Sequence, residues 1–233
     1  MLSVILPTYN EKENIRKVIR RILKVFDRNG IKGEVVVVDD NSPDGTWKIV
    51  ENISKREKRV RLLRRVGKKG LASAVLDGVR RARGNIICVM DADLSHPPET
   101  IPDLLNNLGR WDMVVASRYV KGGKIEKWSW GRRILSRVAA LAATPLSGLK
   151  DPLSGFFLFR KSILKGKNLK PKGFKICLEI LVRCSPRVRE IPYTFSGRKL
   201  GKSKLSMKEI LNFLLHISSL YIFKLKSVLI SRS

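Results

Sequence analysis

The 233-residue sequence contains no glutamine and only three cysteines, and these scarcities exclude several kinds of protein. Cys88, Cys177 and Cys184 are an odd number, lie far apart and form no Cys-x-x-Cys pair. Neither a disulfide framework nor a zinc site is therefore indicated, and we expect each cysteine to pack in the core in a reducing compartment. The absence of glutamine agrees mildly with a heat-adapted protein.

Neither a secretory leader nor a membrane-spanning run is expected. Met1 leads directly into an apolar run, without the basic region and the small-residue cleavage site of a secretory signal. The uncharged stretch at residues 210–223 has 14 residues, fewer than the roughly 20 that cross a bilayer. We therefore expect a protein on the cytoplasmic side that has no spanning segment of its own.

Glycine-rich phosphate loops are missing as well. No Gly-x-Gly-x-x-Gly pattern follows any expected strand, which counts against a dinucleotide-binding dehydrogenase. Residues 197–203 resemble a P-loop, but only three residues, and not four, separate the first glycine from Gly-Lys-Ser. An ATPase interpretation is therefore rejected.

Positive charge, in contrast, is abundant. The net charge is +28, with 27 Lys and Arg against 7 Asp and Glu in residues 101–233. Such an excess implies an anionic partner, which can be nucleic acid, anionic lipid or a phosphorylated substrate. The alternative is the solvated surface of a heat-adapted protein. A nucleic-acid-binding protein would explain the charge, but no recognition motif or aromatic stacking platform is evident, so no nucleic-acid partner is expected.

Short apolar runs alternate with segments of helical spacing along the first half of the chain. The expected strands are residues 2–6, 34–38, 60–64, 85–90 and 112–117, and the expected helices are 15–23, 47–53 and 71–83. In the second half we expect a loop entering a strand at 151–159, a helix at 174–184, an edge strand at 188–195 and one or two helices at 206–230. This order predicts an α/β fold with a mostly parallel sheet, whose ligands bind beyond the carboxyl ends of the strands.

Two acids stand directly after the fourth expected strand. Asp91 and Asp93, separated by one residue at the mouth of a buried strand, are costly unless a cation or hydrogen-bond donors compensate them. A hard divalent ion, held by these carboxylates and by substrate phosphates, is the usual solution. The alternative is a helix N-cap by Asp93 or Ser95, which leaves one of the two acids unexplained.

Asp39 and Asp40 end the second expected strand in a similar way. A carboxylate at this place can accept hydrogen bonds from a nucleotide base or from ribose hydroxyls. The alternative is turn chemistry, because the Asp, Asn, Ser, Pro and Gly residues at 39–45 all favour turns.

Several motifs together resemble a known family. PTYNE at 7–11, VDD at 38–40 and DAD at 91–93 look like glycosyltransferase family 2, which has the GT-A nucleotide-sugar fold. DADLSHPP at 91–98, SRYVKGG at 117–123, DPLSGF at 151–156 and GFKI at 173–176 followed by Glu179 resemble the dolichol-phosphate mannose synthases. This resemblance covers nearly the whole chain. It implies inverting transfer of mannose from GDP-mannose to dolichyl (polyprenyl) phosphate, with Mg²⁺ or Mn²⁺, at the cytoplasmic face of the membrane. The nearest alternative is the same reaction with UDP-glucose.

The resemblance also implies roles for individual residues. Those carried over by motif to the donor nucleotide sugar are Pro7, Tyr9, Glu11, Val38, Asp40, Asp91, Ala92 and Asp93. Arg118, Arg198 and Lys204 are expected there as well, as fixed cations that compensate the charge of the reacting phosphates. The metal is expected at Asp91, Asp93 and Ser95, and the acceptor phosphate at Arg118, Arg132, Ser136 and Arg198. Asp91, Asp93 and Arg118 are the expected catalytic residues. Ser95 replaces a glutamine of some relatives, and GKSK at 201–204 replaces their Gly-Glu-Ser-Lys motif, so an acid has become a base.

The chemistry can also be argued without the family. A phosphate monoester has a second pKa of about 6 and is largely ionised at neutral pH, so this acceptor needs no general base. His96 and His216, the two histidines, are therefore expected to be structural. The reaction needs instead a metal for the departing diphosphate and fixed cations for the incoming phosphate. For any single Lys or Arg the alternative is a solvated surface position.

The C-terminal stretch indicates how the protein meets a membrane. Lys208, Lys224, Lys226 and Arg232 flank the uncharged residues 210–223, as expected for a helix lying on anionic lipid. The alternative is a buried core helix. We therefore divide the chain into a GT-A catalytic domain at 1–205 and an amphipathic membrane-interface segment at 206–233. Many relatives have transmembrane helices after this point or associate with small membrane subunits, so a small transmembrane partner is also expected.

Overall fold

The computed structural model describes residues 1–169, 175–197 and 207–230. The strands are β1 (Leu2–Thr8), β2 (Gly33–Asp39), β3 (Val60–Arg64), β4 (Ile86–Val89), β5 (Met113–Ser117), β6 (Lys124–Ile125), β7 (Phe157–Arg160), β8 (Val188–Pro192) and β9 (Thr194–Phe195). The α-helices are α1 (Ile15–Arg28), α2 (Thr46–Arg56), α3 (Leu71–Arg81), α4 (Ile101–Asn106), α5 (Trp130–Ser147), α6 (Ile176–Cys184) and α7 (Met207–Ile230). Two short 3₁₀ helices, η1 (Pro98–Thr100) and η2 (Lys161–Leu164), follow β4 and β7.

Seven strands form the central sheet in the order β3-β2-β1-β4-β7-β5-β8. The pairs β2–β3, β1–β2, β1–β4 and β5–β8 are parallel, and β7 runs antiparallel to both of its neighbours. The predicted α/β fold with a mostly parallel sheet is therefore confirmed. Because β1 and β2 run in register from Leu2↔Gly33 to Thr8↔Asp39, the motifs that follow both strands meet at one edge of the sheet.

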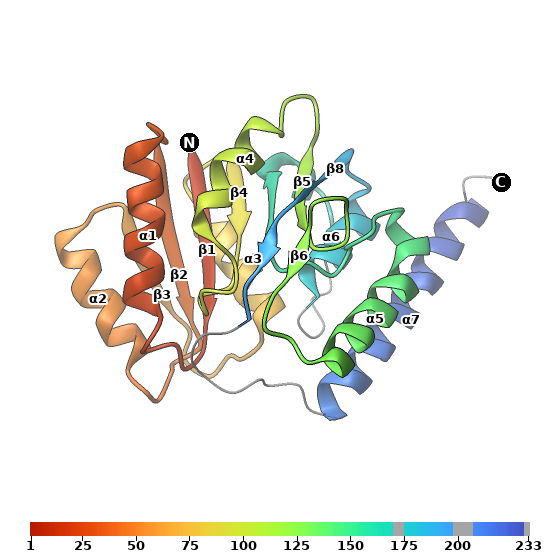
Figure 1. Cartoon of the computed structure of the whole chain (residues 1–233), viewed down its shortest axis with the longest axis horizontal. Coiled ribbons are helices and arrows are strands. Elements are labelled where there is room, and N and C mark those ends of the chain that lie inside the picture. Colours follow the sequence, from red (N-terminus) through yellow and green to blue (C-terminus); the bar gives the residue numbers. More distant parts are fainter. Residues whose placement is uncertain (170–174, 198–206, 231–233) are drawn as a thin grey trace.

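Helices cover both faces of this sheet (Figure 1). Val4 and Leu6 pack in one core cluster with the buried side of α1 and with α4, whereas Ile5 packs in a second cluster with α3 and α6. Neighbouring residues of a strand point to opposite faces, so a strand that is covered on both faces forms a nearly continuous apolar run. This explains why the expected strands show apolar runs without alternation.

Most expected elements are present, and the main differences are a divided edge strand and a helix that the sequence did not predict. The single strand expected at 188–195 is divided, since β8 forms the edge of the main sheet and β9 pairs with β6 in a small second sheet. The C-terminal segment forms one helix, α7, within the expected range. Helix α5 was not predicted. Its apolar residues occur on buried and exposed sides alike, so they do not produce the one-sided pattern by which a surface helix is recognised.

Helices α5 and α7 lie side by side at the end of the molecule away from α1 and α2 (Figure 1). A third apolar cluster joins them to α6 and contains Ala143 and Leu146 of α5, Leu178 of α6, and Ile217 and Leu220 of α7. Among the described residues, no helix is long and apolar enough to cross a membrane. The division at residue 205 stays a prediction, but α7 shares its packing with the helices that precede it.

Candidate active site at the carboxyl ends of the strands

The turn after β2 is organised by Asp39. Its carboxylate is fully buried and accepts hydrogen bonds from Thr8 Oγ1 (2.8 Å), Ser42 N (2.8 Å) and Ser42 Oγ (2.7 Å). These bonds join the ends of β1 and β2. For Asp39 the turn interpretation is therefore confirmed, because the carboxylate stabilises the loop from within.

Asp40, expected at the nucleotide, is bound to a buried arginine. Arg65 Nη2 lies 2.6 Å from Asp40 Oδ1, and the backbone N–H of Gly70 donates to Asp40 Oδ2 at 2.8 Å. Arg65 also donates to Ser73 and Asp77 of α3. The pair thus holds the loop at 65–70 over the end of β2. Arg65 was missed from the sequence, where it is one of many arginines and nothing distinguishes it.

The first loop contributes the other residues expected at the nucleotide. Pro7 of β1 is the register partner of Val38 in β2. The Nζ of Lys69 lies 5.6 Å from the centre of the Tyr9 ring, so the loops after β1 and β3 meet. The backbone N–H of Glu11 donates to Thr46 Oγ1 (3.0 Å) at the start of α2. The structure therefore brings Pro7, Tyr9, Glu11, Val38 and Asp40 to the same edge of the sheet, although their roles stay predictions.

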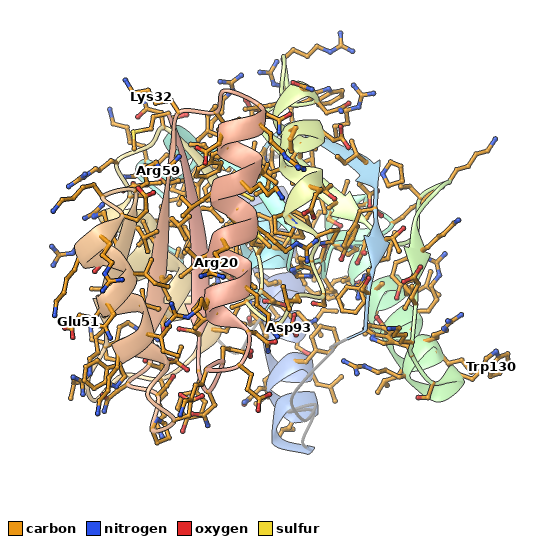
Figure 2. The ribbon with its side chains drawn as sticks, turned by 60° about the vertical axis from the view of Figure 1, so that its left-hand side comes forward. Arg20, Lys32, Glu51, Arg59, Asp93 and Trp130 are labelled. Atoms are coloured by element: carbon orange, nitrogen blue, oxygen red, sulfur yellow. The ribbon has the colours of Figure 1, made fainter. Side chains whose placement is uncertain are left out.

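Asp93 lies at the carboxyl end of the sheet, in the lower half of the view in Figure 2. It is 3% exposed, and its Oδ1 accepts hydrogen bonds from the N–H (3.0 Å) and the hydroxyl (2.5 Å) of Ser95. Neither η1 nor α4 has a side-chain cap, and their N-cap residues are Pro97 and Thr100. The capping alternative is therefore wrong. The Ser95 hydroxyl orients Asp93, and its role as a metal ligand stays a prediction.

The residues at this place fit a divalent cation of the Mg²⁺ or Mn²⁺ type. Such ions are held in enzymes by one or two carboxylates together with substrate phosphates, and here Asp91 and Asp93 are the acids that can provide the carboxylates. No group of three or more His, Cys, Asp or Glu side chains within residues 1–169, 175–197 and 207–230 could hold an ion by itself. A Cβ on Gly155 would lie 3.0 Å from His96 Cε1 and 3.2 Å from Asp91 Oδ2, so a glycine leaves room beside this carboxylate and the His96 ring.

His96 fixes the backbone at Asp91. The N–H of Asp91 donates to His96 Nδ1 at 3.0 Å, so the neutral ring carries its proton on Nε2. Burial lowers the pKa of His96, against the opposing effect of the charges of Asp91 and Asp93, and the ring stacks on Phe156. A neutral, buried ring in this position agrees with the structural role expected from the sequence.

Arg118 is held by a buried carboxylate. Asp151 is fully buried and accepts hydrogen bonds from the backbone N–H (2.9 Å), Nε (2.8 Å) and Nη2 (2.7 Å) of Arg118. Burial alone would lower the pKa of Arg118, but the hydrogen bonds and the charge of Asp151 raise it. The arginine is therefore charged and fixed in direction. Asp151 belongs to a motif noted in the sequence, but its pairing with Arg118 across 33 residues could not be derived there.

Two aromatic residues bring α5 to Arg118. The guanidinium carbon of Arg118 lies 5.1 Å from the centre of the Tyr119 ring and 5.6 Å from that of Trp128. Arg132 lies over the same Trp128 ring at 4.4 Å, and the Tyr119 hydroxyl donates to Ser136 Oγ at 2.8 Å. Arg118, Arg132 and Ser136, which were expected at the acceptor phosphate, are therefore grouped around Tyr119 and Trp128.

Lys175, which directly precedes α6, adds another cation. Burial, and after it the charge of Arg118, lowers the pKa of Lys175 to about 8, although the charges of Asp151 and Asp91 oppose this. The sequence placed Lys175 in a family motif without giving it a role. The expected ligands Arg198 and Lys204 lie outside the described residues.

Comparisons with known proteins agree with this geometry. The family model "Glycosyl transferase family 2" matches residues 3–166. The chain is 45% identical over 222 residues to a dolichol-phosphate mannosyltransferase of Pyrococcus furiosus, an alignment that covers 93% of this chain and 62% of the relative. It is 40% identical over 233 residues to a dolichol-phosphate mannosyltransferase of Saccharomyces cerevisiae, covering 95% of this chain and 87% of the relative. The chain thus spans about three fifths of the length of the Pyrococcus relative.

The fold is found in solved structures as well. The chain matches glucosyl-3-phosphoglycerate synthase of Mycobacterium tuberculosis, solved with Mn²⁺, UDP-glucose and glycerol 3-phosphate, with a TM-score of 0.69 at 19% identity. The match covers 96% of this chain and 79% of that one. At this identity the likeness concerns the fold alone, and it identifies the GT-A fold that the sequence predicted.

Proposed function

The chain belongs to glycosyltransferase family 2, and from this membership we propose that it transfers mannose from GDP-mannose to dolichyl (polyprenyl) phosphate. The names of the relatives at 37–45% identity support both the sugar and the acceptor. The observation that carries the proposal is α5, because this helix combines cations for a phosphate with an apolar surface for a lipid.

The two sides of α5 differ in this respect. Arg132 and Ser136, one helical turn apart, lie on the side that meets Trp128 and Tyr119 beside Arg118. Trp130, which is 79% exposed, and Val138 lie on the opposite side, and Figure 2 shows Trp130 pointing away from the body of the molecule. A phosphate attached to a long hydrocarbon chain is the ligand that matches both sides.

The proposed reaction is a direct displacement. An oxygen of the acceptor phosphate forms a bond to C1 of mannose while the bond from C1 to the β-phosphate oxygen of GDP breaks, so the configuration at C1 inverts. The attacking oxygen is already ionised, and no proton has to be removed. Arg118 and Arg132 orient the incoming phosphate and compensate its charge. A divalent ion bound at Asp91 and Asp93 would supply charge neutralisation for the departing diphosphate.

We further propose that α5 and α7 dock the protein on the cytoplasmic face of an anionic membrane. Among the residues whose side chains the structure describes, the large exposed apolar ones on these helices are Trp130, Ile134, Leu135, Val138 and Leu141 of α5, and Leu211, Leu214, Leu215, Ile222 and Leu225 of α7. We call these ten residues the apolar platform. Exposed Arg133 and Arg137 on α5 and Lys226 on α7 accompany it, as expected for helices lying among anionic headgroups. A small transmembrane subunit remains a proposed further partner.

A transfer assay tests the reaction. Purified protein is incubated with dolichyl phosphate, Mg²⁺ or Mn²⁺, and labelled GDP-mannose or UDP-glucose in parallel, and the label that enters the organic phase is measured. Transfer from GDP-mannose, abolished by EDTA, is expected. Transfer from UDP-glucose alone would move the donor assignment. No transfer from either donor, even with added membranes to supply a partner, would contradict the proposal.

Flotation on liposomes tests the docking. Leu141→Ser and Leu215→Ser remove one exposed side chain from each helix of the apolar platform, and Val66→Ser, 70% exposed in a loop outside the platform, is the matched control. The parent protein and the control are expected to float with anionic vesicles, whereas the combined platform variant stays soluble. Equal flotation of all proteins would contradict docking through this platform.

A further inference from the structure

Helix α7 is attached to α6 by a buried charged cluster. Glu179 of α6 is fully buried, and its Oε2 lies 2.8 Å from Nε2 of His216 in α7. Its other oxygen accepts a hydrogen bond from Arg183 Nε at 2.5 Å. The Phe223 ring of α7 covers the Arg183 guanidinium at 4.5 Å. We call Glu179, Arg183 and His216 the α6–α7 cluster.

The apolar contacts between these helices have little direction. Ile217 and Leu220 of α7 pack against Leu178 and Val182 of α6. Apolar side chains tolerate several packings at a small difference in free energy. A buried carboxylate, in contrast, is strongly destabilised when its partner moves away. The α6–α7 cluster therefore selects one rotation of α7 about its own axis, a role that single buried polar groups are known to have in helix pairing.

This rotation decides where the apolar platform points. His216 is 2% exposed, whereas its neighbour Leu215 is 60% exposed and belongs to the platform. Successive residues of an α-helix are separated by about 100° around its axis. A slip by one position would therefore turn the exposed row of α7 partly toward α6 and expose the row that is now buried.

The same cluster stands next to the active site along α6. The backbone N–H of Glu179 bonds to the carbonyl oxygen of Lys175 (3.3 Å), and Lys175 lies close enough to Arg118 for their charges to interact. One turn of α6, from Lys175 to Glu179, therefore connects α7 with the proposed phosphate site.

From this arrangement we infer that His216 and Glu179 are positioning residues of the transferase. They hold α7 in the rotation at which the platform meets the membrane, and so present the site to an acceptor that is embedded in lipid. This inference rests on the proposed function. It assigns a role to the buried histidine and to Glu179, which the reaction itself does not use.

Substitutions at His216 test the inference. His216→Gln keeps an amide N–H near the position of Nε2, whereas His216→Leu removes the donor and His216→Asn carries an amide too short to reach Glu179. Ser219→Ala, which removes a hydroxyl bonded to the backbone of the same turn, is the matched control. GDP binding in solution and circular dichroism show that each variant is folded.

Two readouts separate positioning from a general loss of structure. We expect His216→Leu and His216→Asn to raise KM for vesicle-embedded dolichyl phosphate, and to weaken vesicle flotation, by about tenfold or more, as expected for losing a hydrogen bond to a charged group. KM for GDP-mannose and turnover with a water-soluble, short-chain polyprenyl phosphate stay within about twofold of the parent values. His216→Gln and Ser219→Ala stay close to the parent on vesicles.

Several outcomes would overturn the inference. These are parent-like flotation of both Leu and Asn variants, equal losses with the soluble and the embedded acceptor, or a Gln variant as weak as the Leu variant. If the parent protein transfers no sugar at all, the proposed function fails, whereas flotation of the same variants still decides whether the cluster orients α7.

Discussion

The Arg118–Asp151 pair permits a quantitative prediction. The Asp151 side chain is fully buried, the Arg118 side chain is 9% exposed, and three hydrogen bonds join the two residues. Replacing either residue by leucine leaves the other charge buried without its partner. Such a loss is expected to lower the free energy of unfolding by about 3–5 kcal/mol. For a protein of this size this corresponds to a fall of about 6–20 °C in Tm.

The double variant Arg118→Leu/Asp151→Leu should be much closer to the parent. Removing both charges also removes the cost of desolvating them, and apolar replacements of buried ion pairs are often neutral or stabilising. We therefore expect a coupling free energy of at least about 2 kcal/mol between the two sites. The double variant should nevertheless transfer no sugar, because the proposed phosphate ligand Arg118 is gone, while GDP binding is retained.

Urea unfolding of the four proteins of this cycle, followed by circular dichroism, measures the coupling. GDP titration and the transfer assay are performed on the same preparations. Additive losses in the single and double variants would refute the reasoning, since they would mean that Asp151 does not compensate Arg118. Unchanged transfer by Arg118→Leu would remove this residue from the phosphate site.

Three further predictions concern the same edge of the sheet. Gly155→Ala places a Cβ 3.0 Å from His96 Cε1 and 3.2 Å from Asp91 Oδ2, a crowding that costs about 1–3 kcal/mol unless the neighbours move. Because the movement would displace Asp91 from the position at which it is proposed to hold the metal, Mn²⁺-dependent GDP affinity should fall about tenfold in calorimetry, and parent-like affinity would contradict this displacement. Asp93→Asn should reduce the Mn²⁺-dependent GDP affinity by at least roughly 10- to 100-fold, which is the loss known for substituting residues that only hydrogen-bond to metal ligands. GDP binding without metal should persist. If Mn²⁺ increased the GDP affinity of the variant as much as that of the parent, Asp93 would be excluded as a ligand. The pKa of Lys175 is about 8 in the folded protein and roughly 10.4 in the unfolded chain. Between these two values the unfolded chain binds more protons than the folded protein, so the free energy of unfolding increases as the pH rises through this window. Lys175→Met should lack this pH-dependent increase. Urea midpoints measured at several pH values would refute the prediction if they changed in parallel for the parent and for Lys175→Met.

Strand and helix order could be predicted because local patterns determine it. Apolar runs such as residues 34–38 indicate strands covered on both faces, and the motifs at their ends indicate where a ligand binds. These parts of the fold and of the site follow from contacts between residues close in sequence, which a linear pattern records.

Helix α5 illustrates where such patterns fail. A surface helix is recognised because its apolar side is buried and its polar side is exposed. In α5 the buried side includes small residues such as Ala140 and Ala143, and the exposed side includes Trp130 and Val138. The sequence alone cannot distinguish an apolar residue that packs in the core from one that is exposed at the surface.

By itself the sequence determined the family, the α/β order and the acids at the ends of β2 and β4, because these are carried by residue types at short spacings. Only the tertiary structure decided which partner each charge has. Arg65 binds Asp40, Asp151 binds Arg118 and His216 binds Glu179 across 25, 33 and 37 residues. Among 48 Lys and Arg residues many pairings are chemically equivalent, and the packing of the helices on the sheet selects the ones that form.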